Sequence, residues 1–175
     1  ARASRVGRII YISHLGAASS SAFTLLRIKG QAETLIRDSG LAFTIIRSGI
    51  VFAPDDAFIN HIAMGFSLNP LFTLMAGQGE VVLHPMYIDD LIQAIIISLE
   101  RIETVDETFN IGGQEYITYE DLIITIMRLT GKNRFIIKMP PYTLRWLNIV
   151  SRIFVRRTLF TNQWYDLLAS NRTAP

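Results

Sequence analysis

Residues 8–54 read RIIYISHLGAASSSAFTLLRIKGQAETLIRDSGLAFTIIRSGIVFAP, and this stretch predicts the fold. RIIYIS at the start is apolar at nearly every position, which is typical of a strand covered on both faces. From about residue 21 to residue 38 the apolar side chains follow helical spacing, and Gly40 is suited to the left-handed turn after a helix. FTIIRSGIVF at 43–52 is the second strand. Two strands joined by a helix of this length predict a parallel βαβ unit, with a right-handed crossover.

The composition limits the class of protein. The chain has 175 residues, of which 50% are hydrophobic and 18% charged, so we expect one folded domain rather than a disordered chain. The formal net charge is only +2, and no basic run alternates with aromatic residues, so we expect no nucleic acid as a partner. Cysteine is absent, which excludes disulfides and thiolate metal sites.

The first residues and one uncharged stretch bear on the chain's organisation. ARASRVGR at the start is typical of a helix end and a turn that lead into a strand, so we expect this chain to be a fragment of a longer protein. Residues 57–79 contain no Asp, Glu, Lys or Arg, but polar residues, a proline and glycines interrupt them. We therefore expect a helix, a turn and a buried strand there, and no membrane-spanning helix.

Between residues 55 and 101, helix-capping residues and chain-breaking residues predict two helices and two strands. Asp55-Asp56 is suited to start a helix that runs to about residue 68, where Asn69-Pro70 ends it. LFTLM at 71–75 and EVVLHPM at 80–86 are strand-like and are separated by a glycine turn. Asp89 is the predicted N-cap of a helix that ends near residue 101.

The last part of the chain contains further strands and helices. Residues 107–113, ETFNIGG, are strand-like and end in a glycine turn. Thr118 begins an approximate capping box for a helix that runs to residue 129. RFIIKMP at 134–140 is a short strand. From residue 142 onward we expect helix, and residues 144–157 place apolar side chains opposite arginines, as in a helix on the domain or on an anionic membrane.

The glycine turn that seats a dinucleotide's pyrophosphate is missing from this sequence. No G-x-G-x-x-G or G-x-x-G-x-x-G follows any predicted strand, and Gly77-x-Gly79 has neither a third glycine nor a helix behind it. Without such a turn and its helix N-terminus, the pyrophosphate has no binding site in this stretch of chain.

The order of motifs nevertheless resembles a known family. Ser13 follows a strand, the next helix carries Lys29 and Glu33, and the second strand ends in Arg-x-x-x-Val-Phe-x-Pro at 47–54. This pattern, with Ile-Ser-His-Leu at 12–15 and three serines at 19–21, resembles the extended or atypical short-chain dehydrogenase/reductases. The likeness is strongest to the atypical branch that includes the NAD(P)H-binding accessory subunit of respiratory complex I.

The resemblance implies a fold and a cofactor. It covers residues 1–175 but only the later part of the family's fold, without the N-terminal glycine-rich βαβ unit. We expect an α/β protein: a partial doubly wound, parallel, Rossmann-like sheet with a small C-terminal α+β lobe on the substrate side. The cofactor implied is NAD or NADP, bound by the longer protein.

The resemblance also implies catalytic residues. In the family a Tyr and a Lys stand four residues apart on this helix, and the Tyr moves the proton that accompanies hydride transfer. Lys29 fits the Lys position, but Leu25 occupies the Tyr position and has no proton to move. Ser13 fits the serine that holds the substrate carbonyl, although a strand-end serine that satisfies the backbone is the alternative. Tyr11 and Tyr87 lie on other elements, and the sequence does not tell whether either reaches the site.

The remaining candidate residues border the same predicted site. The loop after the second strand resembles the family's nicotinamide-binding loop, at the carboxyl end of a strand where ligands bind in open α/β sheets. Its candidate cofactor-binding residues are Ser48, Gly49, Ile50, Val51 and Phe52. The candidate substrate-side residues are His14, Asn60, Met86 and Tyr87, each with plain packing as the alternative. His61 and His84 do not have the spacing of zinc ligands, so no metal is expected.

Two functions remain open at this stage. The first is an NAD(P)(H)-binding protein that is weak or noncatalytic in carbonyl reduction, because Leu25 stands in the Tyr position. The second is an active NAD(P)-dependent oxidoreductase or an epimerase/dehydratase-like enzyme, acting on a small organic or nucleotide-sugar substrate. We expect a cytoplasmic protein, with contact to a membrane or a respiratory complex through residues 144–157 as one alternative. We also expect a homodimer, because the first strand would otherwise present an unpaired edge.

Overall fold

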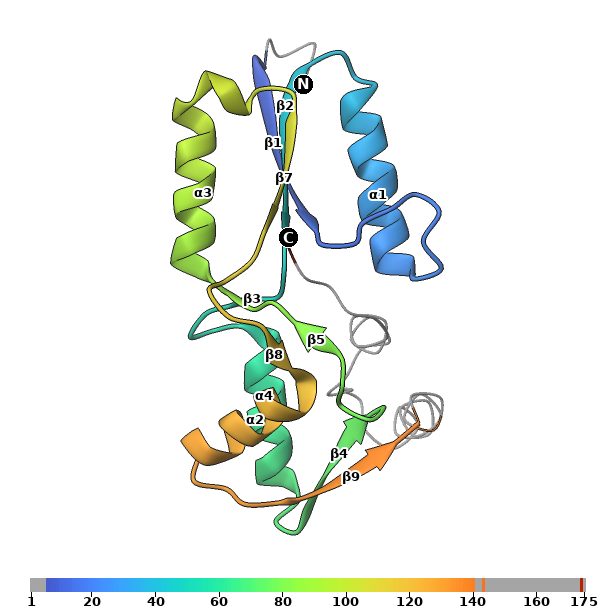
Figure 1. Cartoon of the computed structure of the whole chain (residues 1–175), viewed down its shortest axis with the longest axis vertical. Coiled ribbons are helices and arrows are strands. Elements are labelled where there is room, and N and C mark those ends of the chain that lie inside the picture. Colours follow the sequence, from blue (N-terminus) through green and yellow to red (C-terminus); the bar gives the residue numbers. More distant parts are fainter. Residues whose placement is uncertain (1–5, 141–142, 144–173, 175) are drawn as a thin grey trace. The chain divides into compact units, whose positions relative to one another are not determined.

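The computed structural model of this chain describes residues 6–140, 143 and 174 (Figure 1). The chain divides into two compact units. Unit 1 comprises Ala1–Val51, His84–Glu115 and Arg172–Pro175, and unit 2 comprises Phe52–Leu83 and Tyr116–Asn171. The predicted helices beyond residue 142 lie outside the described residues.

Unit 1 is built on a parallel sheet with a helix on each face. Its strands have the order β1-β2-β7, and both neighbouring pairs run parallel. Helix α1 connects β1 to β2, and Figure 1 shows α1 and α3 on opposite faces of the sheet. The bounds are β1 (Arg8–His14), α1 (Thr24–Arg37), β2 (Ala42–Ser48), β6 (Met86–Tyr87), α3 (Ile88–Glu100), the 3-10 turn η2 (Ile102–Thr104) and β7 (Glu107–Ile111). The α/β class and the parallel βαβ unit are therefore confirmed.

The two faces of this sheet differ in chemistry because successive side chains of a strand point to opposite sides. On the α3 side, Ile46 packs with Met86 and Leu91, and Ile10 and Ile12 join this apolar cluster. On the α1 side lie Tyr11, Ser13 and Arg47, whose polar groups meet the side chains of α1. These three polar residues of the sheet are thus directed toward α1, whereas Thr44, which donates to the Thr104 carbonyl at 2.6 Å, lies on the Ile46 face.

Two predicted strands are shorter than expected. The strand predicted for 43–52 ends at Ser48, and β3 (Val51–Phe52) follows after a break. The break lies where Gly49 passes the backbone carbonyl of His84, so closely that a Cβ on Gly49 would come within 2.1 Å of that oxygen. The strand predicted for 80–86 is likewise divided into β5 (Val82–Leu83) and β6.

Unit 2 combines two helices with short strands. A parallel pair joins β4 to β9, and an antiparallel pair joins β5 to β8. The bounds are α2 (Ala57–Leu68), β4 (Phe72–Ala76), β8 (Ile117–Thr118), α4 (Tyr119–Leu129) and β9 (Phe135–Met139). This unit is the small α+β lobe that the sequence predicts.

Most of the predicted caps are confirmed. Asp56 accepts a hydrogen bond from the backbone of Ile59 at 2.7 Å, and Gly40 has a φ of 68° just after α1. Thr118 accepts one from the backbone of Asp121 at 3.1 Å. The N-cap predicted for Asp89 is wrong, because β6 runs directly into α3 and Tyr87 takes the cap position. Asp89 lies in the first turn instead, where a carboxylate is favoured by the helix dipole.

Strand β1 lies at an edge of the sheet, and β2 is its one strand neighbour among the described residues. This agrees with the open edge expected from the sequence, whereas a second copy of the chain as its partner stays a prediction. No helix within the described ranges is long and apolar enough to cross a membrane.

Candidate functional site

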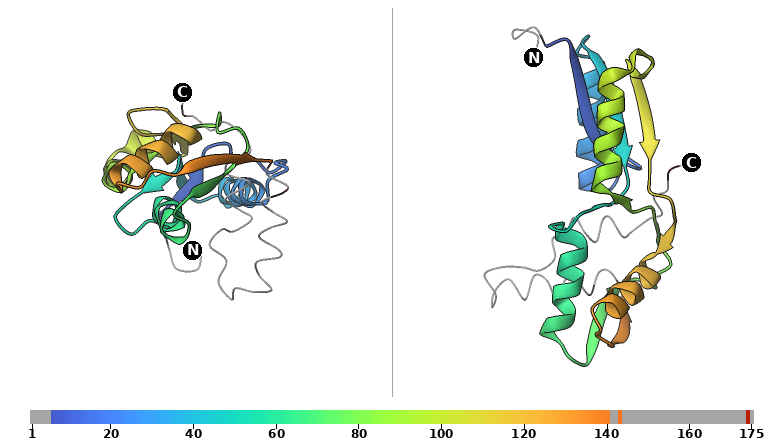
Figure 2. Two further views of the ribbon diagram at one scale, coloured as in Figure 1. Left: turned by 90° about the horizontal axis from the view of Figure 1, so that it is seen from below. Right: turned by 90° about the vertical axis from the view of Figure 1, so that its left-hand side faces the viewer.

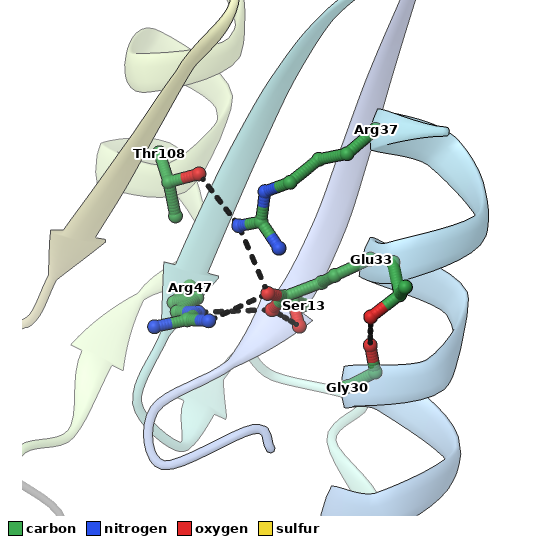
Figure 3. A network of polar contacts seen from close by, with 7 residues as sticks. Ser13, Gly30, Glu33, Arg37, Arg47 and Thr108 are labelled. Carbon is green, nitrogen blue, oxygen red and sulfur yellow. Dashed lines mark hydrogen bonds and ion pairs between the residues drawn. The ribbon is translucent and has the colours of Figure 1, made fainter. Parts of the chain in front are cut away.

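The carboxylate of Glu33 lies at the centre of a polar network between α1 and the sheet (Figure 3). Glu33 is 1% exposed. The Ser13 hydroxyl donates to its Oε1 at 2.5 Å. Arg47 binds both carboxylate oxygens, with Nε 2.9 Å from Oε1 and Nη2 2.6 Å from Oε2. This two-point geometry is the strongest pairing of arginine with a carboxylate.

The network reaches all three strands of the sheet. Ser13 lies on β1 and Arg47 on β2, where the two residues are register partners. Arg37, one helical turn after Glu33, lies 3.3 Å from Oε2 and donates to the Thr108 hydroxyl on β7 at 2.9 Å. One buried carboxylate thus ties α1 to β1, β2 and, through Arg37, β7.

The charges of this network favour an ionised Glu33. Burial by itself would raise the pKa of Glu33, but the hydrogen bonds from Arg47 and Ser13 and the charges of Arg47 and Arg37 outweigh it, so the pKa is lowered. The hydrogen bond to Glu33 raises the pKa of Arg47 in turn. Glu33 is therefore a carboxylate at neutral pH, and it acts as a hydrogen-bond acceptor only.

Lys29 lies one turn before Glu33 on α1 and also holds the end of β1. Its ammonium donates to the backbone carbonyl of Ile12 at 2.8 Å and lies 5.1 Å from the centroid of the Tyr11 ring. That position allows a cation–π contact. Burial, and then the charge of Glu33, raises the pKa of Tyr11, so its phenol stays protonated.

The predicted catalytic residues come together, but the Ser13 proton is already engaged. Ser13 is 3% exposed, and its hydroxyl points to Glu33, so its hydrogen is not directed at a ligand. Leu25 lies in the first turns of α1 and is half-buried. Tyr11 lies on β1 with its ring against the Lys29 ammonium, whereas Tyr87 lies at the end of β6. The catalytic roles of Ser13 and Lys29 stay predictions.

The predicted cofactor loop meets the end of β1. The Ser48 carbonyl accepts a hydrogen bond from the backbone of Leu15 at 2.9 Å, which places this loop beside Ser13 and His14. Gly49 donates to the Ile111 carbonyl at 3.2 Å, and the Ile50 carbonyl accepts from Met86 at 2.8 Å. These three backbone groups of the loop are thus paired within the protein. Val51 and Phe52 follow in β3 and are half-buried.

The substrate-side candidates lie in both units. His14 lies at the end of β1, with Nδ1 2.9 Å from the Leu15 carbonyl. Met86 is buried in the apolar cluster of unit 1. Asn60 belongs to unit 2, where its amide donates to the carbonyls of Pro54 and Asp56, both at 2.8 Å. The structure thus groups His14 with Ser13 and leaves Asn60 and Met86 in local packing contacts.

Sequence reasoning missed two features of this region. The first is the role of Glu33, for which the spacing of Lys29 and Glu33 before a strand containing Arg47 was an available signal. The second is His84, whose ring lies against Gly112 and whose Nε2 is 2.8 Å from the Gly113 carbonyl. The glycine pair after β7 was the signal in that case. Among the residues the structure describes, no group of His, Asp and Glu could hold a metal ion.

Comparison with known proteins finds relatives over part of their length. No model of a known protein family matches the sequence. The NADH dehydrogenase [ubiquinone] 1 alpha subcomplex subunit 9, mitochondrial, of Mus musculus is 28% identical over 144 residues, which are 81% of this chain and 37% of the relative. The subunit of the same name from Arabidopsis thaliana is 29% identical over 116 residues, 66% of this chain and 29% of the relative. The chain is thus similar to these subunits over most of its length. It spans little more than a third of the length of the mouse relative.

Solved structures support the fold of this chain. UDP-glucose 4-epimerase of Thermotoga maritima, with UDP-glucose, matches with a TM-score of 0.61 and 22% identity, covering 78% of this chain and 51% of the epimerase. UDP-glucose 4-epimerase of Thermus thermophilus, in complex with NAD, matches with a TM-score of 0.62 and 15% identity, covering 79% and 53%. At these identities the likeness establishes the Rossmann-like fold alone.

The described residues fit only part of a dinucleotide. Lys29 uses one of its three donors on Ile12, so its ammonium can also bind hydroxyl groups such as those of a ribose. The glycines with close neighbours are used for internal packing. A Cβ on Gly30 would come within 2.3 Å of the backbone of Ala18, and one on Gly112 within 2.0 Å of the His84 ring. Neither glycine leaves room for a pyrophosphate.

Proposed function

We propose that this chain is the C-terminal portion of a longer NAD(P)(H)-binding protein, and that the protein is weak or noncatalytic in carbonyl reduction. The observation that carries the proposal is the hydrogen bond from Ser13 to the buried carboxylate of Glu33, at 2.5 Å. The hydroxyl that would hold a substrate carbonyl gives its proton to the protein instead. The glycine-rich seat for the pyrophosphate belongs, in this proposal, to the part of the protein outside this chain.

Among the described residues, the two at the family's acid and serine positions, Leu25 and Ser13, offer no free proton for carbonyl reduction. Reduction of a carbonyl needs hydride from the cofactor and a proton from an acid within hydrogen-bond reach. Leu25 has no such proton, and Ser13 donates to Glu33. The ring of Tyr11 lies against the Lys29 ammonium, on the sheet face under α1. In this proposal a bound nicotinamide is held without a proton donor at these positions.

The cofactor is NAD or NADP in this proposal. Solved structures of the same fold contain NAD, among them the Thermus thermophilus epimerase. Lys29 would bind the ribose hydroxyls by its remaining donors, and the loop at Ser48 to Phe52 would border the nicotinamide. Reduced or oxidised nicotinamide would supply hydride chemistry when bound. This chain's own contribution would be to orient that end of the cofactor.

The proposed partners follow from the curated relatives. Their name places them in the NADH dehydrogenase [ubiquinone] 1 alpha subcomplex, so we propose association with a respiratory complex of that kind. Contact through residues 144–157 belongs to this proposal and lies outside the described residues. The relatives are named as mitochondrial, so a cytoplasmic location stays a prediction that fractionation of cells would decide.

A second candidate function is catalysis on a nucleotide sugar. It is supported by the fold shared with the UDP-glucose 4-epimerases and with a dTDP-glucose 4,6-dehydratase of Streptomyces venezuelae, at a TM-score of 0.59. In that case an unidentified acid would have to replace the family's Tyr. An epimerase assay with UDP-glucose separates the two candidates.

The proposal is tested in the longer protein by following NADH oxidation with a panel of aldehydes and ketones. We expect NADH binding without turnover, and measurable turnover after Leu25→Tyr, which restores the acid four residues before Lys29. Ser13→Ala should leave NADH binding within about twofold, because its hydroxyl is engaged by Glu33. Ordinary turnover in the wild-type protein, lost in Ser13→Ala, would contradict the proposal and favour an active enzyme.

A further inference from the structure

Lys29 and Glu33 of α1 bind two consecutive residues of β1. The Lys29 ammonium donates to the Ile12 carbonyl at 2.8 Å. The Ser13 hydroxyl donates to Glu33 at 2.5 Å (Figure 3). Lys29 and Glu33 stand four residues apart, so they share the face of α1 that meets the sheet, and the right-hand view of Figure 2 shows α1 on the side of the sheet away from α3. These two contacts fix where the Lys29 side chain meets the end of β1.

The ring of Tyr11 supplies a further contact to the same ammonium. Tyr11 precedes Ser13 by two residues, so both side chains lie on the α1 face of the sheet. Nζ of Lys29 lies 5.1 Å from the centroid of the Tyr11 ring, within the roughly 6 Å over which an aromatic face attracts a cation. The attraction is to the face of the ring, so it does not need the hydroxyl group.

The ammonium of Lys29 is thus held by groups of the chain itself. A lysine side chain loses much of its rotamer freedom when it is fixed, and here the Ile12 carbonyl and the Tyr11 ring fix it. One of its three donors is used on Ile12, and the ring attracts the charge without taking a conventional hydrogen bond, so two donors remain. Ordering of this kind lowers the entropy cost of binding and therefore raises the affinity for a ligand.

The position of this ammonium suits a pair of neighbouring oxygen atoms. Ile12 lies two residues before the end of β1, and ligands of open α/β sheets bind beyond the carboxyl ends of the strands. Two donors on one ammonium match two adjacent acceptors, such as the hydroxyl groups of a ribose.

We propose that Tyr11 is a positioning residue for Lys29: its ring, with the Ile12 carbonyl, holds the ammonium where two adjacent ribose hydroxyls of the nicotinamide half can accept hydrogen bonds from it. This role rests on the proposed function, in which Lys29 binds that ribose. It adds that the Tyr11 ring, and not its hydroxyl, determines how tightly the ribose is bound.

The test measures the dissociation constants of NADH and ADP by calorimetric titration of the longer protein and its variants. ADP lacks the nicotinamide ribose and is the control ligand. Tyr11→Leu removes the ring, so it should weaken NADH binding at least about threefold and leave ADP binding within about twofold of wild type. Tyr11→Phe keeps the ring and should stay within about twofold for both ligands. Lys29→Ala should weaken NADH binding at least as much as Tyr11→Leu.

Phe43→Leu is the matched control for lost packing. Phe43 lies on β2 four residues before Arg47, so its ring is on the same face of the sheet, and it is half-buried like Tyr11. Both ligands should bind this variant within about twofold of wild type, because the Lys29 ammonium keeps its contacts with Tyr11 and Ile12.

A measurement on the 175-residue chain keeps the test decisive if Tyr11→Leu fails to fold. In the nuclear magnetic resonance spectrum, the Tyr11 ring current should shift the ε-methylene protons of Lys29 upfield of those of Lys132, whose ammonium contacts the Ser67 hydroxyl. The shift should persist in Tyr11→Phe. Equal positions of the two lysine signals would overturn the proposal.

The outcomes separate this role of Tyr11 from the proposed function. NADH binding that is weakened in Lys29→Ala but unchanged in Tyr11→Leu would overturn the role of Tyr11 alone. Losses in Tyr11→Leu that are matched by Phe43→Leu, by Tyr11→Phe or by ADP would also overturn it, because packing or the hydroxyl would then account for them. Absence of NADH binding by the wild-type protein, or unchanged binding in Lys29→Ala, would contradict the proposed binding of the cofactor and overturn both.

Discussion

The most specific consequence of the network in Figure 3 is the cost of neutralising Glu33. Glu33→Gln keeps the shape of the side chain but removes its charge and one of its two acceptor oxygens. Ser13 and Arg47 then compete for one oxygen, and an N–H₂ group is turned toward Arg47. We expect this substitution to destabilise unit 1 strongly.

The magnitude follows from burial. Removing the charge of one partner of a buried ion pair lowers the free energy of unfolding by about 3–5 kcal/mol. Arg47 and Arg37 have side chains 26% and 38% exposed, so both can recover water and the cost lies at the lower end of that range. We expect about 3 kcal/mol, of which the more exposed Arg37 pair supplies less than about 1 kcal/mol. With a urea dependence of about 2 kcal/mol per molar, the unfolding midpoint falls by about 1.5 M.

Urea unfolding followed by circular dichroism measures the loss of unfolding free energy in Glu33→Gln. Hydrogen exchange of the β2 amides shows whether unit 1 is the part that is destabilised. Glu120→Gln is the matched control, because its partner Lys138 is 2.8 Å away and both side chains are about a third exposed. The control should lose less than about 1 kcal/mol. A midpoint for Glu33→Gln no lower than that of Glu120→Gln would refute the reasoning that Glu33 ties α1 to the sheet.

The same pair of proteins gives a pH dependence. The pKa of Glu33 is lowered from its usual value of 4.5, so the folded state binds a proton less readily than the unfolded state. The stability that Glu33 contributes is complete above its unfolded pKa and is lost as the pH falls through the folded pKa. The difference in unfolding free energy between wild type and Glu33→Gln should therefore shrink below about pH 4.5. A difference that grows on acidification would contradict the lowered pKa.

Three further predictions concern other parts of the chain. Gly112→Ala should destabilise unit 1 by about 1–3 kcal/mol in a thermal melt, because its Cβ would lie 2.0 Å from Nδ1 of His84. Gly65→Ala in α2 is the control: its Cβ would have nothing within 4 Å, so this substitution should be neutral or stabilising. In the longer protein, Lys29→Ala should raise the dissociation constant for NADH, which a fluorescence titration measures; unchanged affinity would separate Lys29 from the cofactor. The isolated chain should be a dimer by light scattering, because β1 offers an open edge; a monomeric mass, with strand neighbours on both sides of β1 in one chain, would exclude that pairing.

The local elements were predictable because their signals are local. The βαβ unit follows from apolar runs and a helical pattern, and Asp56, Thr118 and Gly40 mark helix ends by side-chain or backbone chemistry within a few residues. The Glu33 network was not predictable in that way. Lys29 and Glu33 at i, i+4 are also typical of an exposed helix face, and only the parallel register of β1 with β2 brings Ser13 and Arg47 to Glu33.

Other differences arise from contacts distant in sequence. The break after β2 depends on the carbonyl of His84 approaching Gly49, which is 35 residues earlier in the chain. The start of α3 depends on β6 leading directly into it, so that Tyr87 rather than Asp89 occupies the cap. The hydrogen bond of Ser13 is a further contact that depends on distant residues. Its position at a strand end was expected, but the direction of its hydrogen bond depends on a carboxylate one helix away.

The central claim is that this chain orients one end of a dinucleotide whose pyrophosphate is bound elsewhere in the protein. Calorimetric titration with NADH tests it most directly, comparing the 175-residue chain with the longer protein that contains it. The claim predicts binding by the longer protein and an affinity at least about 100-fold weaker for the chain alone, because no glycine turn seats the pyrophosphate. A low-micromolar dissociation constant for the chain alone, or no binding by the longer protein, would contradict it.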